Sequence, residues 1–81
     1  MNEPEIRSTI RNFIVEELIR DPGYDLGQDE GIISGGLMDS FALAELGVFI
    51  ESEFDVYIPD PELTVEKMDT LDQIVSRVLM G

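Results

Sequence analysis

One serine is the side chain around which this chain of 81 residues can most readily build chemistry. Ser40 follows the segment Gly-Gly-Leu-Met-Asp at residues 35–39 and precedes Phe41, where a glycine-rich loop gives way to a helical pattern. The sequence contains no cysteine and no histidine, and Lys67 is its single lysine. Because it therefore offers neither a thiol nucleophile nor an imidazole base, we expect a chain that is not an enzyme and that carries a group attached to Ser40.

Three interpretations of Ser40 stay open on the residues alone. Serine and aspartate are favoured helix N-caps, so Asp39 and Ser40 can simply start a helix, and spacing alone favours this interpretation. A Ser40–Lys67 dyad would make a hydrolase, although an isolated serine and lysine seldom meet. A phosphate ester on Ser40 would also suit a helix N-terminus, whose free N–H groups and dipole favour negative charge.

Charge is the strongest compositional feature, with 18 acidic residues against 5 basic ones and a net charge of −13. Such a chain repels nucleic acid phosphates, whose binding needs clustered lysine and arginine. The same field should attract basic protein surfaces and speed encounter with them. The alternative is that the acidity serves solubility alone.

Calcium is a further partner that an acidic chain suggests, and the loop that starts at Asp25 superficially resembles an EF-hand loop. That template requires glycine at its sixth position and a bidentate glutamate at its twelfth. Glu30 and Gly36 occupy those positions. The sequence thus predicts no metal site, and we expect the carboxylates of this loop to be solvated.

A single all-α domain covering residues 1–81 is expected to position Ser40. A first helix is predicted over about residues 3–19, with Asn2 as its cap and an Asp-Pro-Gly stop at residues 21–23. A long loop over residues 21–38 follows, held by spaced apolar anchors. The hydrophobic share of 43% is ordinary for a globular chain.

The second predicted helix begins at Asp39 or Ser40 and ends near Glu53. Its core-facing stripe contains Leu43, Leu46, Gly47, Ile50 and Phe54, and a second apolar patch nearer the surface contains Phe41, Ala44 and Val48. Residues 54–59 are predicted to be an extended loop, and residues 61–68 a short helical turn. A last helix has Asp69 or Thr70 as its cap and a Thr70–Gln73 capping box. The pattern predicts a small bundle of three main helices plus one short helix.

The segment Leu-Met-Asp-Ser-Phe at residues 37–41 resembles the Asp-Ser-Leu signature of acyl carrier and peptidyl carrier proteins. The resemblance continues in Glu45-Leu46 and in Glu-Ser-Glu-Phe-Asp-Val-Tyr-Ile-Pro-Asp at residues 51–60, which is similar to a family segment at the same distance from the serine. Length, acidity and helix order agree, so the resemblance covers essentially the whole chain.

This resemblance implies that Ser40 receives 4′-phosphopantetheine from coenzyme A and that Asp39 helps the modifying phosphopantetheinyl transferase to recognise it. The attached arm then supplies the thiol that holds the cargo as a thioester. Ile58 matches a position that borders the arm or its cargo, with core packing as the alternative. A partner-docking helix is implied for Phe41, Ala44, Glu45, Val48 and Glu51.

Three departures from the fatty-acid type are visible. Phe41 replaces the usual leucine, which is similar to D-alanyl carrier proteins and some stand-alone aminoacyl carriers. Ala42 and Ser52 stand where fatty-acid carriers often have carboxylates, and residues 60–71 resemble a segment of discrete secondary-metabolism carriers. These departures argue against a housekeeping fatty-acid role and leave the cargo open.

The resulting hypothesis is a cytoplasmic, monomeric carrier that presents an acyl or aminoacyl group to separate enzymes of fatty-acid, polyketide, nonribosomal-peptide or related biosynthesis. Its expected partners are the phosphopantetheinyl transferase and the loading, condensing or transfer enzymes with basic docking surfaces. No run of residues is apolar enough to span a membrane. The alternative is an unmodified acidic helical adaptor that binds basic protein surfaces and has no need of Ser40.

Overall fold

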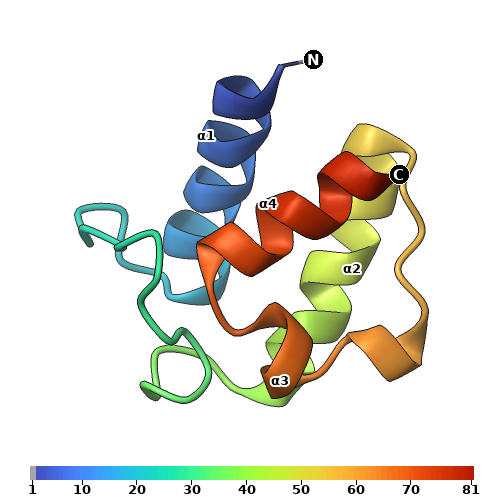
Figure 1. Cartoon of the computed structure of the whole chain (residues 1–81). Helices are drawn as coiled ribbons and strands as arrows, with labels where there is room; N and C mark the ends of the chain where they lie inside the picture. The colour runs from blue at the N-terminus through green and yellow to red at the C-terminus, as the bar shows by residue number, and fades with distance from the viewer. Residues whose placement is uncertain (1) are drawn as a thin grey trace.

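The computed structural model describes residues 2–81, which form helices and no strand (Figure 1). The order is α1 (Glu3–Phe13), a π-helical turn η1 (Ile14–Leu18), α2 (Ser40–Phe54), a 3₁₀ turn η2 (Asp60–Glu62), α3 (Val65–Met68) and α4 (Leu71–Met80). Figure 1 shows α1 and α2 on opposite sides of the view, with α4 running across between them. The predicted all-α bundle, with its long loop between the first and second helices, is confirmed.

The first helix begins as the sequence predicts, because the Asn2 side chain accepts a hydrogen bond from the Glu5 N–H at 3.0 Å. Its extent also agrees with the prediction, but its last five residues widen into the π-helical turn η1, in which the Ile19 N–H donates to the Ile14 carbonyl at 2.7 Å. Arg20 then adopts a left-handed conformation with φ of 63° and ends the helical path just before the predicted stop.

The C-terminal helices follow local signals that the sequence carries. The predicted turn over residues 61–68 is divided between η2 and α3. Thr70, and not Asp69, caps α4: its side chain accepts from the Gln73 N–H at 3.1 Å, and the Gln73 side chain accepts from the Thr70 N–H at 3.0 Å. This reciprocal pair is the predicted capping box.

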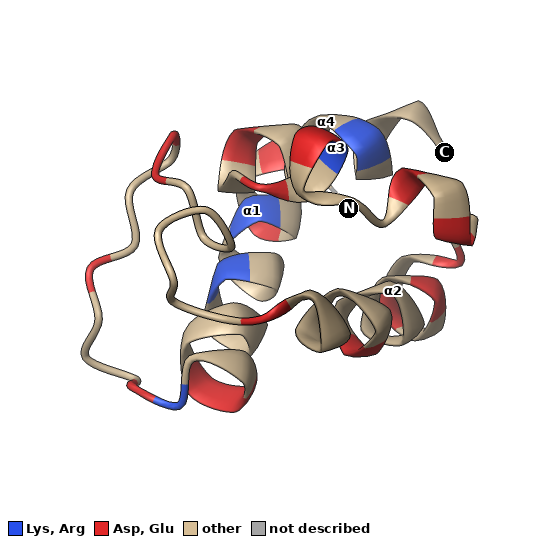
Figure 2. Cartoon of the chain, turned by 90° about the horizontal axis from the view of Figure 1, so that it is seen from below, with Lys and Arg blue, Asp and Glu red and all other residues tan. Residues whose placement is uncertain are grey.

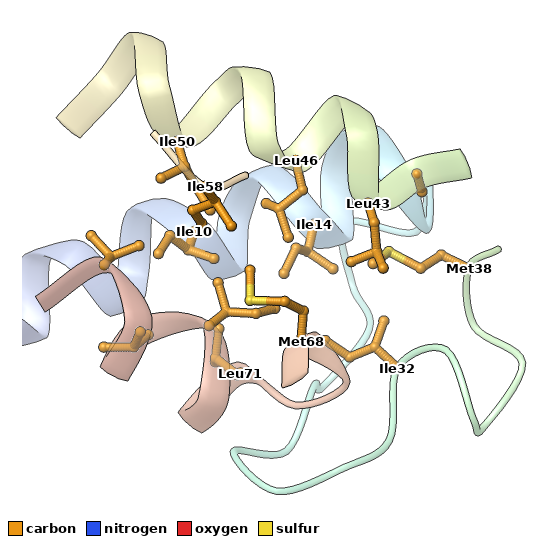
Figure 3. Close-up of a cluster of buried hydrophobic side chains, with 14 of the residues drawn as sticks. Ile10, Ile14, Ile32, Met38, Leu43, Leu46, Ile50, Ile58, Met68 and Leu71 are labelled. Atoms are coloured by element: carbon orange, nitrogen blue, oxygen red, sulfur yellow. The ribbon is translucent and has the colours of Figure 1, made fainter. Parts of the chain in front are cut away.

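The core is built from one stripe on each main helix together with residues of the long loop. Leu43, Leu46 and Ile50 of α2 are buried, as predicted. Figure 3 shows Ile32 and Met38 of the loop pointing into the same cluster, and Leu26 of the loop is buried as well. The loop is therefore a packed part of the domain, because its apolar anchors replace water contacts with core contacts.

The described part of the chain measures 27 × 26 × 19 Å along its principal axes, with a radius of gyration of 11.3 Å. Within residues 2–81, every helix is too short or too polar to cross a membrane.

Candidate functional site

Ser40 is exposed and is the first helical residue of α2. The cap of this helix is its neighbour Asp39, whose Oδ1 accepts a hydrogen bond from the Ala42 N–H at 3.1 Å. Asp39 has extended backbone angles, as an N-cap residue requires. The interpretation of Ser40 as the cap is thus excluded, and its hydroxyl is available for attachment of another group.

A tight turn leads into this helix start. The Gly35 N–H donates to the Gly31 carbonyl at 3.0 Å, and the Leu37 N–H donates to the Ile32 carbonyl at 2.9 Å. A Cβ on Gly35 would lie 2.3 Å from the Gly31 carbonyl oxygen, and Gly36 has φ of 79°. Both glycines of the segment before Ser40 are therefore required, Gly35 for close approach and Gly36 for its left-handed backbone.

Five residues form a face on α2 that combines apolar and acidic side chains, and we call it the α2 face. Phe41 and Val48 are 81% and 69% exposed, and large apolar groups that gather on one exposed face are typical of an interaction surface. Figure 2 shows α2 with acidic positions and no basic ones. The α2 face consists of Phe41, Ala44, Glu45, Val48 and Glu51, all exposed.

Ile58 lies beneath this face, and only 3% of its surface is exposed. It lines a hollow of about 160 Å³ together with Gly47, Val48, Tyr57 and Leu63. A Cβ at position 47 would lie 3.3 Å from Leu63 Cδ1 at the wall of this hollow, so any larger residue would have to displace the Leu63 side chain by a few tenths of an ångström. The alternative of core packing thus describes most of the Ile58 surface, and the rest borders the hollow.

Lys67 belongs to a different part of the surface. It lies on α3 and lines a hollow of about 470 Å³ with Met68, Gln73 and Arg77. Ser40 is not part of that hollow. The structure therefore gives no support to the Ser40–Lys67 dyad.

The acidic loop that starts at Asp25 is organised by hydrogen bonds. Glu30 accepts from the Tyr24 hydroxyl and from the Gly27 N–H, and both hydrogen bonds lower the pKa of Glu30. The hydrogen bond to Glu30 also raises the pKa of Tyr24. Asp25 pairs with Arg11 at 3.3 Å. The expectation of solvated carboxylates is therefore wrong for Glu30. Within residues 2–81, no group of three or more acidic side chains is arranged to hold a metal ion.

Two residues, Arg20 and Asp69, make contacts that the sequence did not predict. Arg20 lines a hollow of about 210 Å³ with Asp39, Phe41 and Glu45, beside the first turn of α2. Asp69 binds the N–H groups of Ile33 and Ser34 across the chain. Neither role has a local sequence signal. The position of Arg20 depends on the π-helical turn that precedes it. The Asp69 contacts join residues that are 35 and 36 positions apart in the sequence.

A small helical bundle that exposes one serine at the start of its second helix, beside an apolar and acidic helix face, has the architecture of a small carrier protein. Curated relatives agree with this class. The chain is 33% identical to a D-alanyl carrier protein of Streptococcus suis (strain 05ZYH33) over 75 residues, which cover 93% of this chain and 92% of the relative.

Two further relatives have the same name. The chain is 34% identical to the D-alanyl carrier protein of Streptococcus sanguinis (strain SK36), with 80% of this chain and 81% of the relative covered. It is 38% identical to that of Lactobacillus acidophilus (strain ATCC 700396 / NCK56 / N2 / NCFM), with 69% and 73% covered. No protein-family model matches the chain. The chain belongs to the family of small carrier proteins of the acyl carrier and peptidyl carrier type.

Proposed function

We propose that this chain is a non-catalytic carrier that holds an acyl or aminoacyl group as a thioester on a 4′-phosphopantetheine arm attached to Ser40. In the modification, the Ser40 oxygen forms a bond to the phosphorus of the arm while the phosphoanhydride bond of coenzyme A breaks. The serine proton is lost and adenosine 3′,5′-bisphosphate leaves. When attached, the arm supplies the thiol that this cysteine-free chain does not have.

The observation that carries this proposal is the separation of roles between Asp39 and Ser40. Because Asp39 supplies the cap, the exposed Ser40 hydroxyl can be esterified without loss of the hydrogen bond that starts α2. The N–H groups of the first helical turn favour a nearby negative charge, so the residues present fit a phosphodiester at this position.

An aminoacyl cargo, and specifically D-alanine, is favoured over the cargo of fatty-acid, polyketide or nonribosomal-peptide pathways. The relatives are named D-alanyl carrier proteins, and Phe41 stands where fatty-acid carriers have leucine. The hollow beside Ile58, at about 160 Å³, is smaller than sites that take drug-sized ligands and suits a small group.

The proposed partners are a phosphopantetheinyl transferase, an enzyme that activates and loads the amino acid, and an acceptor enzyme that removes it. The α2 face offers these partners exposed apolar contacts bordered by Glu45 and Glu51. Basic surfaces on the partners would be steered toward it, and rapid release would allow the carrier to visit each enzyme in turn. The tether itself raises the local concentration of cargo at each partner.

Intact-mass measurement after incubation with coenzyme A and a broad-specificity phosphopantetheinyl transferase tests the proposal. The wild-type protein should gain the mass of one phosphopantetheinyl group, and Ser40→Ala should gain none. Ser52→Ala is the matched control, because Ser52 is an exposed serine of the same helix and should leave the gain unchanged. No gain with several transferases would overturn the proposal and favour the unmodified acidic adaptor.

Loading of the modified protein tests the cargo. With an ATP-dependent enzyme that activates D-alanine, radiolabelled D-alanine should become attached to the modified protein and should be released by hydroxylamine, which cleaves thioesters. Ser40→Ala should acquire no label. Loading of fatty-acyl groups in place of D-alanine would contradict the aminoacyl assignment while preserving the carrier proposal.

A further inference from the structure

Asp69, at the junction of α3 and α4, binds the long loop with both of its carboxylate oxygens. Oδ1 accepts from the Ile33 N–H at 2.8 Å and from the Ser34 N–H at 2.9 Å, and Oδ2 accepts from the Ser34 hydroxyl at 2.6 Å. The Asp69 carbonyl also accepts from the Ile32 N–H at 2.7 Å. We call this set of four hydrogen bonds the Asp69 clasp.

The clasp holds the carboxylate in its charged form. Partial burial raises the pKa of Asp69, but the hydrogen bonds from Ser34 and Ile33 outweigh burial and place that pKa below its ordinary value. Asp69 is itself fixed, because its N–H donates to the Gln73 side chain at 2.9 Å within the start of α4. A charged acceptor on a fixed backbone is a strong anchor for the loop.

A short run of hydrogen bonds connects the clasp to the start of α2. The Ile32 carbonyl accepts from the N–H groups of Leu37 and Met38, at 2.9 and 3.3 Å. The Met38 side chain is buried in the core, and the next residue is the cap Asp39. The backbone held at residues 32–34 therefore fixes the backbone that enters the helix immediately before Ser40.

The Asp69 clasp leaves no space for a side chain at position 31. A Cβ on Gly31 would lie 2.1 Å from the Ser34 hydroxyl oxygen and 3.0 Å from Asp69 Oδ2. This turn therefore accepts only glycine at position 31 while Ser34 and Asp69 remain bonded. Gly31 and the Asp69 clasp are therefore parts of one closely packed turn, and this turn belongs to the segment that leads to Ser40.

We propose that Asp69 is a positioning residue for the modification of Ser40: by clasping the turn over residues 31–38 it fixes the direction in which the chain enters α2. The proposal rests on the proposed function, in which Ser40 is the attachment point. Loss of the clasp lowers the fraction of molecules that present Ser40 correctly. The apparent affinity for the transferase falls in proportion to this competent fraction. The KM for the carrier should therefore rise while kcat stays unchanged.

The test compares Asp69→Ala, Asp69→Asn and Ser34→Ala with the wild-type protein as substrates of the transferase. Asp69→Ala should raise KM about tenfold if the competent fraction falls to about a tenth. Asp69→Asn keeps an acceptor for the Ile33 and Ser34 N–H groups and should recover part of the loss. Ser34→Ala removes one hydrogen bond, leaves the core untouched and should give a smaller increase in KM.

Asp72→Ala is the matched control, because the Asp72 side chain pairs with Arg7 and takes no part in the Asp69 clasp. The variant keeps the backbone N–H of residue 72, which donates to the Gln28 carbonyl of the loop at 3.0 Å. It should destabilise the protein and leave KM unchanged. Amide hydrogen exchange gives an independent measurement: in Asp69→Ala, the Leu37 and Met38 amides should exchange faster, while the Ile50 amide in α2 should not.

The possible negative results separate the positioning role of Asp69 from the proposed carrier function. Equal KM values for wild type and Asp69→Ala, with Leu37 exchange unchanged, would overturn the positioning role and leave the carrier function intact. An increase in KM for Asp72→Ala equal to that for Asp69→Ala would show that stability, and not position, is responsible. Absence of modification in the wild-type protein itself would instead overturn the proposed function.

Discussion

At the scale of single residues, two neighbours divide two tasks at the start of α2. Asp39 satisfies the Ala42 N–H, and Ser40 stays exposed. The carboxylate of Asp39 thus has a structural role that any good N-cap can fill, and a proposed recognition role that depends on its charge. These roles can be separated because asparagine caps helices as well as aspartate does.

Asp39→Ala should lower the free energy of unfolding by about 1 kcal/mol, because the cap is lost. Asp39→Asn should leave stability nearly unchanged while it reduces modification by the transferase, since the negative charge is removed. Thermal denaturation and transferase kinetics on the same three proteins check this. Full modification rates for Asp39→Asn would restrict Asp39 to its structural role.

At the scale of elements, α2 has two sides with different surroundings besides its buried core stripe. One side presents the α2 face to solvent, and the other contributes Phe49, whose ring stacks on Phe13 of α1 with centroids 3.9 Å apart. Glu45 and Glu51 belong to the α2 face, whereas Glu53 lines the hollow beside the Phe13–Phe49 stack. Glu53 is therefore a suitable control residue for charge substitutions in the same helix.

Glu45→Lys or Glu51→Lys should reduce kcat/KM with a partner enzyme on the order of tenfold, because steering by opposite charge is lost. Unfolding free energies should change by no more than about 0.5 kcal/mol, as is usual for exposed sites. Glu53→Lys makes the same change in net charge on the other side of the helix and should affect turnover much less. Equal losses for all three variants would assign the effect to net charge and remove the α2 face as the docking site.

At the scale of the whole molecule, a net charge of −13 is confined within 27 × 26 × 19 Å. The Debye length is about 30 Å at 0.01 M salt and about 8 Å at 0.15 M. At low salt every acidic group therefore repels others across the entire domain, and at physiological salt only near neighbours interact.

Raising the salt concentration from 0.01 to 0.15 M should therefore raise the melting temperature, because self-repulsion of the folded state is screened. The same change should slow association with a basic partner. Thermal denaturation and stopped-flow association at constant pH measure the two effects. A melting temperature that falls over this range would mean that screened ion pairs, such as Arg77–Glu62 at 2.7 Å, outweigh the repulsion.

Local signals explain which parts of the fold could be predicted from the sequence. The caps of α1 and α4 are hydrogen bonds between residues only three positions apart, made by Asn2 and by Thr70 with Gln73. The starts of these two helices can therefore be predicted from residue spacing. Phe54 ends α2 one residue beyond the predicted end, because Asp55 adopts a left-handed conformation with φ of 56° and stops the helix there.

The remaining features of the site depend on contacts between distant parts of the chain. Asp69 was a candidate cap by local pattern, yet its carboxylate binds Ser34, 35 residues away. The choice between Asp39 and Ser40 as the cap is decided by backbone geometry, because both residue types cap well. The proposed role of Ser40 as the attachment point could be predicted only by resemblance, since one exposed serine has no chemical signature of its own.

The cap that Asp39 provides has a consequence for how partners distinguish different forms of the carrier. A group attached to Ser40 displaces none of the contacts that start α2, so the bare and loaded forms should share one backbone and one docking surface. An enzyme that binds the α2 face would then bind both forms with the same affinity. Selection between them must depend on the attached group reaching the enzyme's own pocket, and bare carrier should act as a competitive inhibitor of its loaded form.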